Sequence, residues 1–382
     1  MPAVPPARTP RNESIDCLRG GVMILMALDH TRDFFGAPVD MHTAPLALWL
    51  TRWLTHYCAP VFVYLAGMSA YLHGRRLSTA ALSAFLLKRG LWLVLLEVTV
   101  VRAAWSLQFG PGNGVLQVIW AIGVAMLALA ALVWLPRPVI AALALALVAG
   151  HNHWDPVRAE GLGDLGWVWV LLHQGGPLAP FEGARWFVAY PALPWIGVMA
   201  GGYVMGPWAL SSRAERRARF LGAGLAVTGG FLILRATNLY GDPHPWTLEG
   251  EPLRTMLSFL DCEKYPPSLL YLMMTLGPAW CVLAWLDRPL GTWASRVAIY
   301  GRVPLFYYVL HLFLIHGLAI VLALPVLGAA AVTRQYMPFG GLAWPLPGVY
   351  AMWIAVVLAL YPACRWFAEV KRRNPSPWLS YL

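Results

Sequence analysis

The sequence predicts an all-α membrane protein, a bundle of about ten transmembrane helices with both termini in the cytoplasm. Of its 382 residues, 59% are hydrophobic and only 12% are charged, whereas a soluble domain has about a quarter charged residues. Apolar runs of the roughly 20 residues that a bilayer crossing requires recur along the whole chain. These runs are continuously apolar rather than alternating, which favours helices over membrane strands.

The expected spans follow one another closely. They cover residues 15–36, 46–73, 83–106, 113–135, 137–151, 187–207, 217–236, 266–287, 298–323 and 345–368. Asp29 and His30 interrupt the first run and no small-residue cleavage site follows it, so we expect this run to stay in the mature protein. Residues 1–14 are expected to be a disordered cytoplasmic segment, 15–370 one transmembrane domain, and 371–382 a cytoplasmic tail.

Lys and Arg residues predict the orientation of the bundle, because they gather in alternate connections. They are Arg8, Arg11, Arg75, Arg76, Lys88, Arg89, Arg137, Arg213, Arg216, Arg217, Arg219, Arg288, Arg296, Lys371, Arg372 and Arg373. With ten spans all of them lie on one side, which the positive-inside rule makes cytoplasmic. The net charge of +10 is then mainly a topology signal, and we expect membrane lipids rather than nucleic acid around the protein. The expected location is the cell membrane, which is the inner membrane if the source is a bacterium.

The cysteine and histidine patterns predict no metal site. Five cysteines are widely spaced without a C-x-x-C pair, so neither a zinc site nor a disulfide framework is indicated. The sequence "HNHW" (151–154) has two histidines at a helix end, but an i, i+2 spacing without a third ligand favours an interfacial position.

The first span contains the polar cluster "ALDHTRDFF" (27–35). His30 follows Arg19 by eleven positions, so both lie on nearly the same helix face, about 16 Å apart along the axis. Asp33 is at i+3 from His30, Asp29 precedes it directly, and either carboxylate could orient its imidazole. Arg32 is at i+3 from Asp29 and could pair with it. Two interpretations stay open, a catalytic site or an ion-pair network that only holds helices together.

Two further spans supply polar side chains. His56 is at i+4 from Arg52, and Pro60 is expected to bend the helix beside them. Because the first two spans are antiparallel neighbours, His30 and His56 can meet. In the ninth span, Tyr307 is at i−4 from His311 and is expected either to hydrogen-bond it or to line the same cavity, which we expect His311 to face. His316 is expected to be a packing or interfacial residue.

The two long external connections, 152–186 and 237–265, are rich in acidic residues, and ordered long loops are commonly functional. Lys264 and Tyr265 precede the eighth span at its external mouth. The lysine either extends to the interface, as interfacial lysines do, or contacts a substrate.

Several blocks of the sequence resemble the heparan-α-glucosaminide N-acetyltransferase-like membrane proteins, including their bacterial branch. The blocks are "RNESIDCLRGGVMILMALDH" (11–30), "THYCAPVFVYLAGMSAYL" (55–72), "FVAYPALPWIGVMAGGYVMG" (187–206), "KYPPSLLYLMMTLGP" (264–278) and "GRVPLFYYVLHLFLIH" (301–316). Arg19, ten intervening residues and His30 also resemble the Arg-X10-His signature of the wider transmembrane acyltransferase superfamily. The resemblance implies an enzyme that passes an acyl group from cytosolic acyl-CoA to an acceptor on the other side.

The resemblance puts His30 at the signature's catalytic histidine and Arg19 at its arginine. In the lysosomal sugar acetyltransferase, however, the position of His30 reads as asparagine, and the active histidine lies in the following loop. Here that loop has His42 without the Asn-Gly that follows in the relative, and His56 stands where the relative has an aspartate. The catalytic assignment therefore stays divided between His30, His56 and His42.

The sequence-based hypothesis is an acyltransferase that uses acetyl-CoA or another acyl-CoA as co-substrate and a small molecule or glycan as acceptor. His30, oriented by Asp33 or Asp29, is the expected general base or acyl carrier, and His56, Arg52 or Tyr307 would stabilise the oxyanion. Candidates for the CoA phosphates are Arg75, Arg76, Lys88 and Arg89. The alternative is a proton-coupled transporter or flippase in which the Asp/His cluster relays protons. Whether the protein forms a homo-oligomer stays open.

Overall fold

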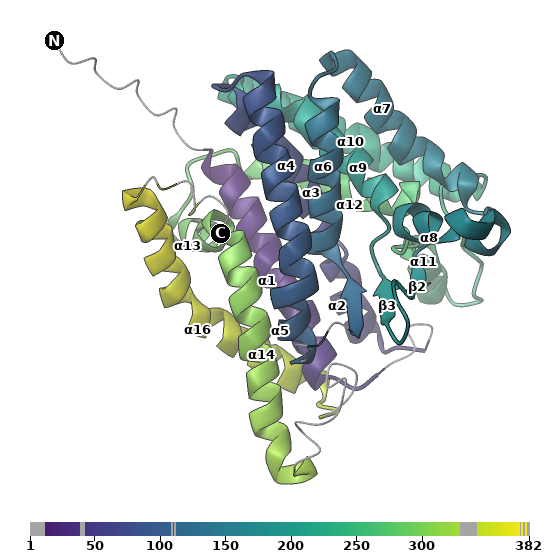
Figure 1. The fold of residues 1–382 in the computed structure, drawn as a ribbon, viewed down its shortest axis with the longest axis vertical. Helices are drawn as coiled ribbons and strands as arrows, with labels where there is room; N and C mark the ends of the chain where they lie inside the picture. The colour runs from purple at the N-terminus through teal and green to yellow at the C-terminus, as the bar shows by residue number, and fades with distance from the viewer. Residues whose placement is uncertain are drawn as a thin grey trace.

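The computed structural model describes residues 12–38, 43–107, 110, 112–328, 342–374, 376 and 379. In this part of the chain the fold is mainly helical, as Figure 1 shows. It departs from the all-α prediction in one small sheet of three strands, β1 (Asn113–Leu116), β2 (Gly176–Leu178) and β3 (Arg185–Val188), in the order β1-β3-β2. β1 pairs with β3 in parallel, and β2 pairs with β3 antiparallel.

Each expected span contains a helix. The helices are α1 (Glu13–Phe35), α2 (Leu46–Thr55), α3 (Cys58–Gly74), α4 (Thr79–Leu96), α6 (Val118–Leu132), α7 (Arg137–Gly150), α9 (Ala192–Met205), α10 (Arg213–Thr237), α12 (Leu269–Leu286), α13 (Thr292–Arg302), α14 (Pro304–Leu327) and α16 (Leu346–Arg373). A π-helical turn, Glu97–Val101, connects α4 to α5 (Arg102–Ser106). α1 begins two residues before the expected boundary and Asn12 caps it, while residues 1–11 of the expected disordered segment lie outside the described residues. α16 takes in the first three residues of the expected tail.

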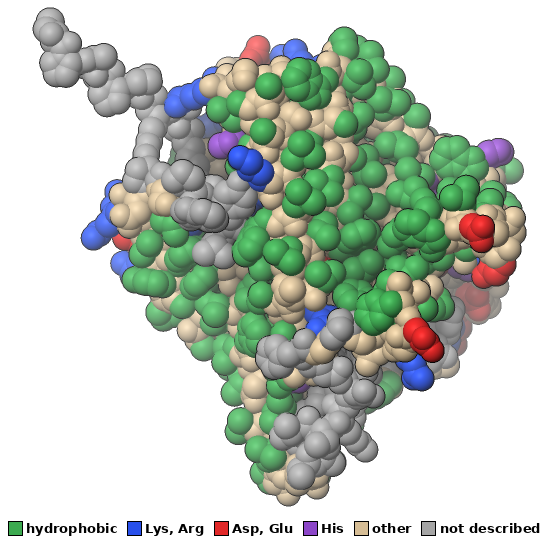
Figure 2. Space-filling model, in the orientation of Figure 1, with side chains coloured by type: hydrophobic (Ala, Val, Ile, Leu, Met, Phe, Trp, Pro, Cys, Tyr) green, Lys and Arg blue, Asp and Glu red, His purple; other side chains and the backbone are tan. Residues whose placement is uncertain are grey.

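The protein is an integral membrane protein. Among the described residues, four helices (α10, α12, α14 and α16) are long and apolar enough to cross a membrane. α6 is apolar but has only 15 residues, and α1 has 23 residues but carries the charged cluster. Figure 2 shows hydrophobic side chains over most of the visible face. About ten spans and cytoplasmic termini stay predictions.

α1 lies at the centre of the bundle, where it packs against α3, α13, α14 and α16. Asn12 caps its start, because the Asn12 side chain accepts a hydrogen bond from the backbone nitrogen of Ser14 at 3.2 Å. One turn further on, Arg19 donates to the carbonyl of Gly301 at 3.1 Å and to Ser69 Oγ at 3.0 Å. Arg19 thus ties α1 to both α13 and α3.

The backbones of α1 and α13 touch directly beside Arg19. A Cβ atom at Gly20 would lie 2.0 Å from the carbonyl oxygen of Val297, and one at Gly301 would lie 1.9 Å from the carbonyl oxygen of Asp16. No side chain fits at such distances, so the glycine after Arg19 is required by packing.

We therefore expect Gly20→Ala to destabilise the protein by about 1–3 kcal/mol, the usual range for overpacking a tight contact. Gly21 is the matched control, because a Cβ there would meet nothing within 4 Å and alanine favours a helix. Thermal unfolding in detergent should show a lower midpoint for Gly20→Ala and an unchanged or higher one for Gly21→Ala. Equal midpoints for the two variants would contradict the close backbone contact between α1 and α13 at Gly20.

The second expected span is broken in two, α2 and α3, at His56 and Tyr57. Pro60 lies in the first turn of α3, where its missing N–H leaves no intrahelical bond unmade. The backbones of His56 and Tyr57 keep helical angles, so the helix is interrupted there rather than ended, and the bend expected beside His56 stays a prediction. Tyr271 of α12 holds the interruption in place, because its hydroxyl donates to the backbone carbonyl of His56 at 2.8 Å.

The connection between α10 and α12 folds around Arg235, which is 1% exposed. Its guanidinium donates to four backbone carbonyls, those of His244, Ser258, Phe259 and Asp261, at 2.6–3.1 Å. This long loop and its short helix α11 (Pro252–Leu260) are therefore an ordered part of the fold.

Candidate functional site

His30 forms a hydrogen-bonded pair with His311. Nδ1 of His30 lies 2.7 Å from Nε2 of His311, and the rings are nearly parallel, with centroids 5.0 Å apart. Nδ1 of His311 lies 2.9 Å from the carbonyl oxygen of Tyr307, which can only accept. His311 must therefore donate from Nδ1, and in a neutral ring its Nε2 carries the lone pair. It follows that His30 donates from Nδ1 and keeps its own lone pair on Nε2.

The two carboxylates expected to orient His30 lie on Arg32 instead. Nη2 of Arg32 is 3.0 Å from Asp29 Oδ1 and 2.8 Å from Asp33 Oδ1. The expectation of a His30–carboxylate pair is wrong, because a guanidinium between two carboxylates on the same helix end forms the stronger charge-assisted contacts. His311 takes the orienting position.

Aromatic rings enclose the histidine pair. Trp105 of α5 and Tyr308 of α14 meet His30 edge to face, with centroids at 4.9 Å and 6.0 Å. Tyr307 is stacked on His311 at 5.1 Å. Tyr307 and His311, both expected to face a cavity, are 0% exposed and line neither of the two cavities described below. On α14 it is Tyr308, the residue after Tyr307, that lines one of these cavities.

The first cavity, which we call the helix cavity, lies between α1, α3, α4, α6 and α14 and has a volume of about 390 Å³. Its apolar wall includes Met23, Met26, Phe62 and Ile122. Met26 is one helical turn from His30, and Tyr308, which contacts His30, also lines the cavity. Neither histidine lines the cavity, so Tyr308 and the helical turn from Met26 to His30 connect it to the pair.

The polar lining of the helix cavity is basic. Its basic side chains are Arg19, His73, Arg89, Arg302 and Lys371. None of the described residues that line it is acidic. The cavity thus combines a narrow apolar interior with a set of cations, a combination that suits a ligand with an apolar arm and anionic groups.

Of the four residues expected to bind CoA phosphates, Arg89 lines the helix cavity. Arg75, Arg76 and Lys88 are exposed and do not line it, because they lie on the outward side of the α3–α4 turn and of α4. Arg19, expected to be near substrate, does line it.

The second cavity, which we call the loop cavity, lies between residues 43–56 and 235–265 and has a volume of about 820 Å³. Its lining includes four predicted site residues, Arg52, His56, Lys264 and Tyr265. Arg52 and His56 share one helix face, as their i, i+4 spacing predicted. Nδ1 of His56 is buried without a hydrogen-bond partner.

The loop cavity adjoins the charged end of α1. Arg52 and Lys264 act electrostatically on both Asp29 and His56. Lys264 Nζ lies 5.0 Å from the ring centre of Tyr265. Burial lowers the pKa of Lys264, but Tyr265 and Asp29 more than offset this, so the net shift is upward from 10.5. The lysine is therefore charged at neutral pH and gives the lining of this cavity a positive charge.

Sequence reasoning missed three of these features. Tyr308 is at i−3 from His311, a spacing that could have indicated it. Arg302 and Lys371 join the helix cavity from distant parts of the chain and gave no local signal. His42, one of the three candidates for the catalytic histidine, lies outside the described residues.

A family model described as heparan-alpha-glucosaminide N-acetyltransferase, catalytic, matches residues 11–233, more than half of the chain. No curated protein matches the sequence. The matched range contains Arg19, His30, His56 and Arg89, whereas His311 and Lys264 lie beyond it.

Proposed function

This chain belongs to the heparan-alpha-glucosaminide N-acetyltransferase family, and from this premise we propose that it is a membrane-embedded acyltransferase. It would take an acyl group, in the first instance acetyl, from acyl-CoA and transfer it to a hydroxyl or amine on the other side of the membrane. The observation that supports this is the position of His30. It lines neither cavity itself, but it contacts Tyr308, which lines the helix cavity. It also follows Asp29, on which the loop-cavity residues Arg52 and Lys264 act electrostatically.

Acyl-CoA is proposed to bind in the helix cavity. The pantetheine arm suits the apolar interior between Met23 and Ile122, and the phosphates suit Arg89 and Lys371, since charge-assisted contacts favour anions there. The thioester would then lie near Met26 and Tyr308, within one helical turn of His30.

The acceptor is proposed to come from the loop cavity, past His56, Arg52 and Lys264. His30 Nε2 would take the proton of the acceptor hydroxyl or amine as that group attacks the thioester carbonyl. The new C–O or C–N bond forms, the C–S bond breaks, and the His30 imidazolium returns its proton to the CoA sulfur. An acyl group carried on His30 itself is the second route.

The positive charge that His30 gains during transfer would be stabilised by His311, which accepts its Nδ1–H. The oxyanion that develops on the thioester carbonyl needs donors. Tyr308, which contacts His30, and His56, whose Nδ1 has no partner, are the proposed ones, and the earlier candidate Tyr307 is fully buried behind His311.

The test is transfer of a radiolabelled acetyl group. Purified protein in nanodiscs, which expose both faces, is incubated with labelled acetyl-CoA and a panel of amino sugars and sugar alcohols. We expect label on at least one acceptor, or acetyl-CoA hydrolysis when the acceptor is absent. If the protein shows no acetyl-CoA binding, no hydrolysis and no transfer, the enzyme is excluded and the proton-coupled transporter is favoured.

Arg89→Ala is expected to raise the Kd for acetyl-CoA about 10- to 100-fold, because one charge-assisted hydrogen bond contributes about 1.5–3 kcal/mol. Lys88→Ala is the matched control, since Lys88 is the preceding residue of α4 but is exposed and outside the cavity. Titration of both variants with labelled acetyl-CoA makes the comparison. An equal loss of affinity in the two variants would contradict the proposal that acetyl-CoA binds in the helix cavity.

A further inference from the structure

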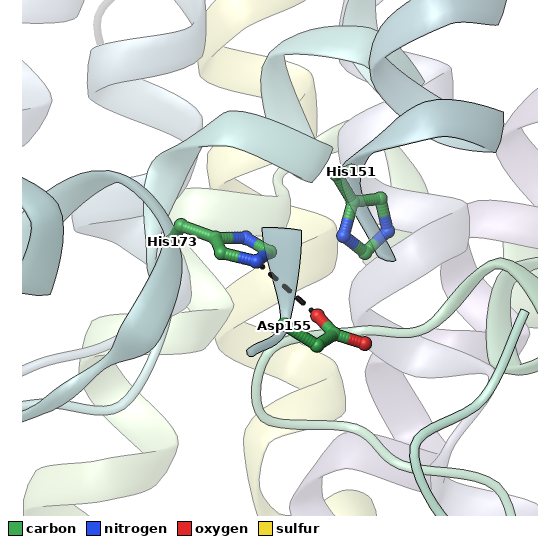
Figure 3. A group of neighbouring side chains, drawn as sticks. All are labelled: His151, Asp155 and His173. Atoms are coloured by element: carbon green, nitrogen blue, oxygen red, sulfur yellow. Dashed lines mark ion pairs between the residues drawn. The ribbon is translucent and has the colours of Figure 1, made fainter. Parts of the chain in front are cut away.

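A cluster of metal-ligating side chains lies away from both cavities, in the segment that follows α7. His151, Asp155 and His173 each offer one ligand atom, and these atoms all lie within 4.8 Å of one another. Figure 3 shows the three side chains pointing into the same space. His173 Nε2 is 3.2 Å from Asp155 Oδ1, and the rings of His151 and His173 meet edge to face at 5.5 Å.

The two imidazoles are buried with nitrogens that lack partners. His151 is 0% and His173 2% exposed. His173 Nδ1 has no hydrogen-bond partner, and neither ring nitrogen of His151 makes a bond of good geometry, although the backbone of Pro267 lies close enough to interact with that ring. An unsatisfied buried polar group costs about 1–3 kcal/mol, so packing alone does not explain why two histidines converge on a carboxylate here.

We propose that His151, Asp155 and His173 bind a zinc ion. Two neutral imidazoles and one carboxylate are a ligand set that zinc favours, with water as the fourth ligand. Tetrahedral zinc requires ligand atoms about 3.4 Å apart. His173 Nε2 and Asp155 Oδ1 are already 3.2 Å apart, and the other ligand atoms lie within 4.8 Å of one another, so zinc binding requires only small rotations of the side chains.

The surroundings supply the support that metal ligands require. Asn152 donates to the other carboxylate oxygen of Asp155, Oδ2, at 2.9 Å. The Asn152 side-chain oxygen accepts from the backbone nitrogen of Leu269, at the start of α12, at 2.9 Å. The backbone of Pro267 lies beside His151. The site therefore joins the end of α7, the segment that carries His173 and the start of α12.

The zinc would hold three segments of the chain together, and its site is separate from the one proposed for acyl transfer. It would lock the segment 151–188, with β2 and β3, onto the bundle. The "HNHW" motif gave only a weak signal because its second histidine, His153, is exposed, while the partner of His151 is His173, further along the chain. His151 is thus buried rather than interfacial.

Metal content is the test. The protein is produced in zinc-supplemented medium with an affinity tag that contains no histidine, and zinc per chain is measured by mass spectrometry. We expect about one zinc per chain in the wild type and its loss in His151→Ala and His173→Ala. His153→Ala, two residues away and outside the cluster, is the matched control and should keep the zinc.

A second measurement covers the case in which these variants do not fold. A chelator should lower the thermal midpoint of the wild-type protein, and added zinc should restore it. A wild-type protein without zinc after supplementation overturns the proposal. So does a double variant, His151→Ala with His173→Ala, that retains the metal, or a control that loses it.

Discussion

His30→Ala is expected to abolish acyl transfer while the protein stays folded. A positioned general base contributes about 10²- to 10⁴-fold to the rate, and a residue that also carries the acyl group would contribute more. Single-turnover consumption of labelled acetyl-CoA measures the loss without interference from product release. Donor binding should change little, because the cations of the helix cavity remain.

The more informative variant is His30→Asn. The asparagine amide can still donate to His311 Nε2 from about the position of Nδ1 but has no basic nitrogen. We expect it to be as inactive as His30→Ala and at least as stable. Full activity in either variant would move the catalytic role to another histidine. The candidates are His56, which lines the loop cavity and has an unpaired Nδ1, and His42.

His311→Leu is expected to lower kcat by about 10²- to 10⁴-fold, the scale seen when the residue that fixes the tautomer of a catalytic histidine is lost. Nε2 of His311 normally accepts the Nδ1–H of His30. When leucine removes this acceptor, the His30 proton is free to move from its Nδ1 to its Nε2, and the reacting nitrogen loses its lone pair. The KM for acetyl-CoA should stay near the wild-type value, because His311 does not line the helix cavity.

His311→Gln distinguishes orientation from packing. Its side-chain oxygen can accept the Nδ1–H of His30, so part of the lost kcat should return. His316→Gln is a control on the same helix, since His316 is buried but contacts the carbonyl of Ala104 at 2.8 Å rather than His30. If Leu and Gln at position 311 were equally inactive, the hydrogen bond would have no role.

The helices and the local faces of the site were predictable from sequence, because both follow from hydrophobicity and the helical repeat. The alignment of Arg19 with His30 and of Arg52 with His56 needs only 100° per residue. The bend expected beside His56 follows from Pro60. The short strands were not predictable, since β1 and β3 pair across a long stretch of sequence.

The partner of His30 was not predictable, because it depends on how α1 and α14 pack. Spacing within one helix shows only which groups can meet on that helix, and it pointed to Asp33. Both carboxylates, those of Asp29 and Asp33, pair with Arg32 instead. The partner of His30 is His311, which is 281 positions away in the sequence. The same limit applies to Lys371 in the helix cavity and to His173 in the proposed zinc site.

The most direct test of the central claim is an experimental structure of the protein with a non-hydrolysable acetyl-CoA analogue at saturating concentration. We expect the analogue in the helix cavity, with its phosphates at Arg89 and Lys371 and its carbonyl carbon beside His30 Nε2. An analogue bound in the loop cavity, or one whose carbonyl is remote from His30, would contradict the claim.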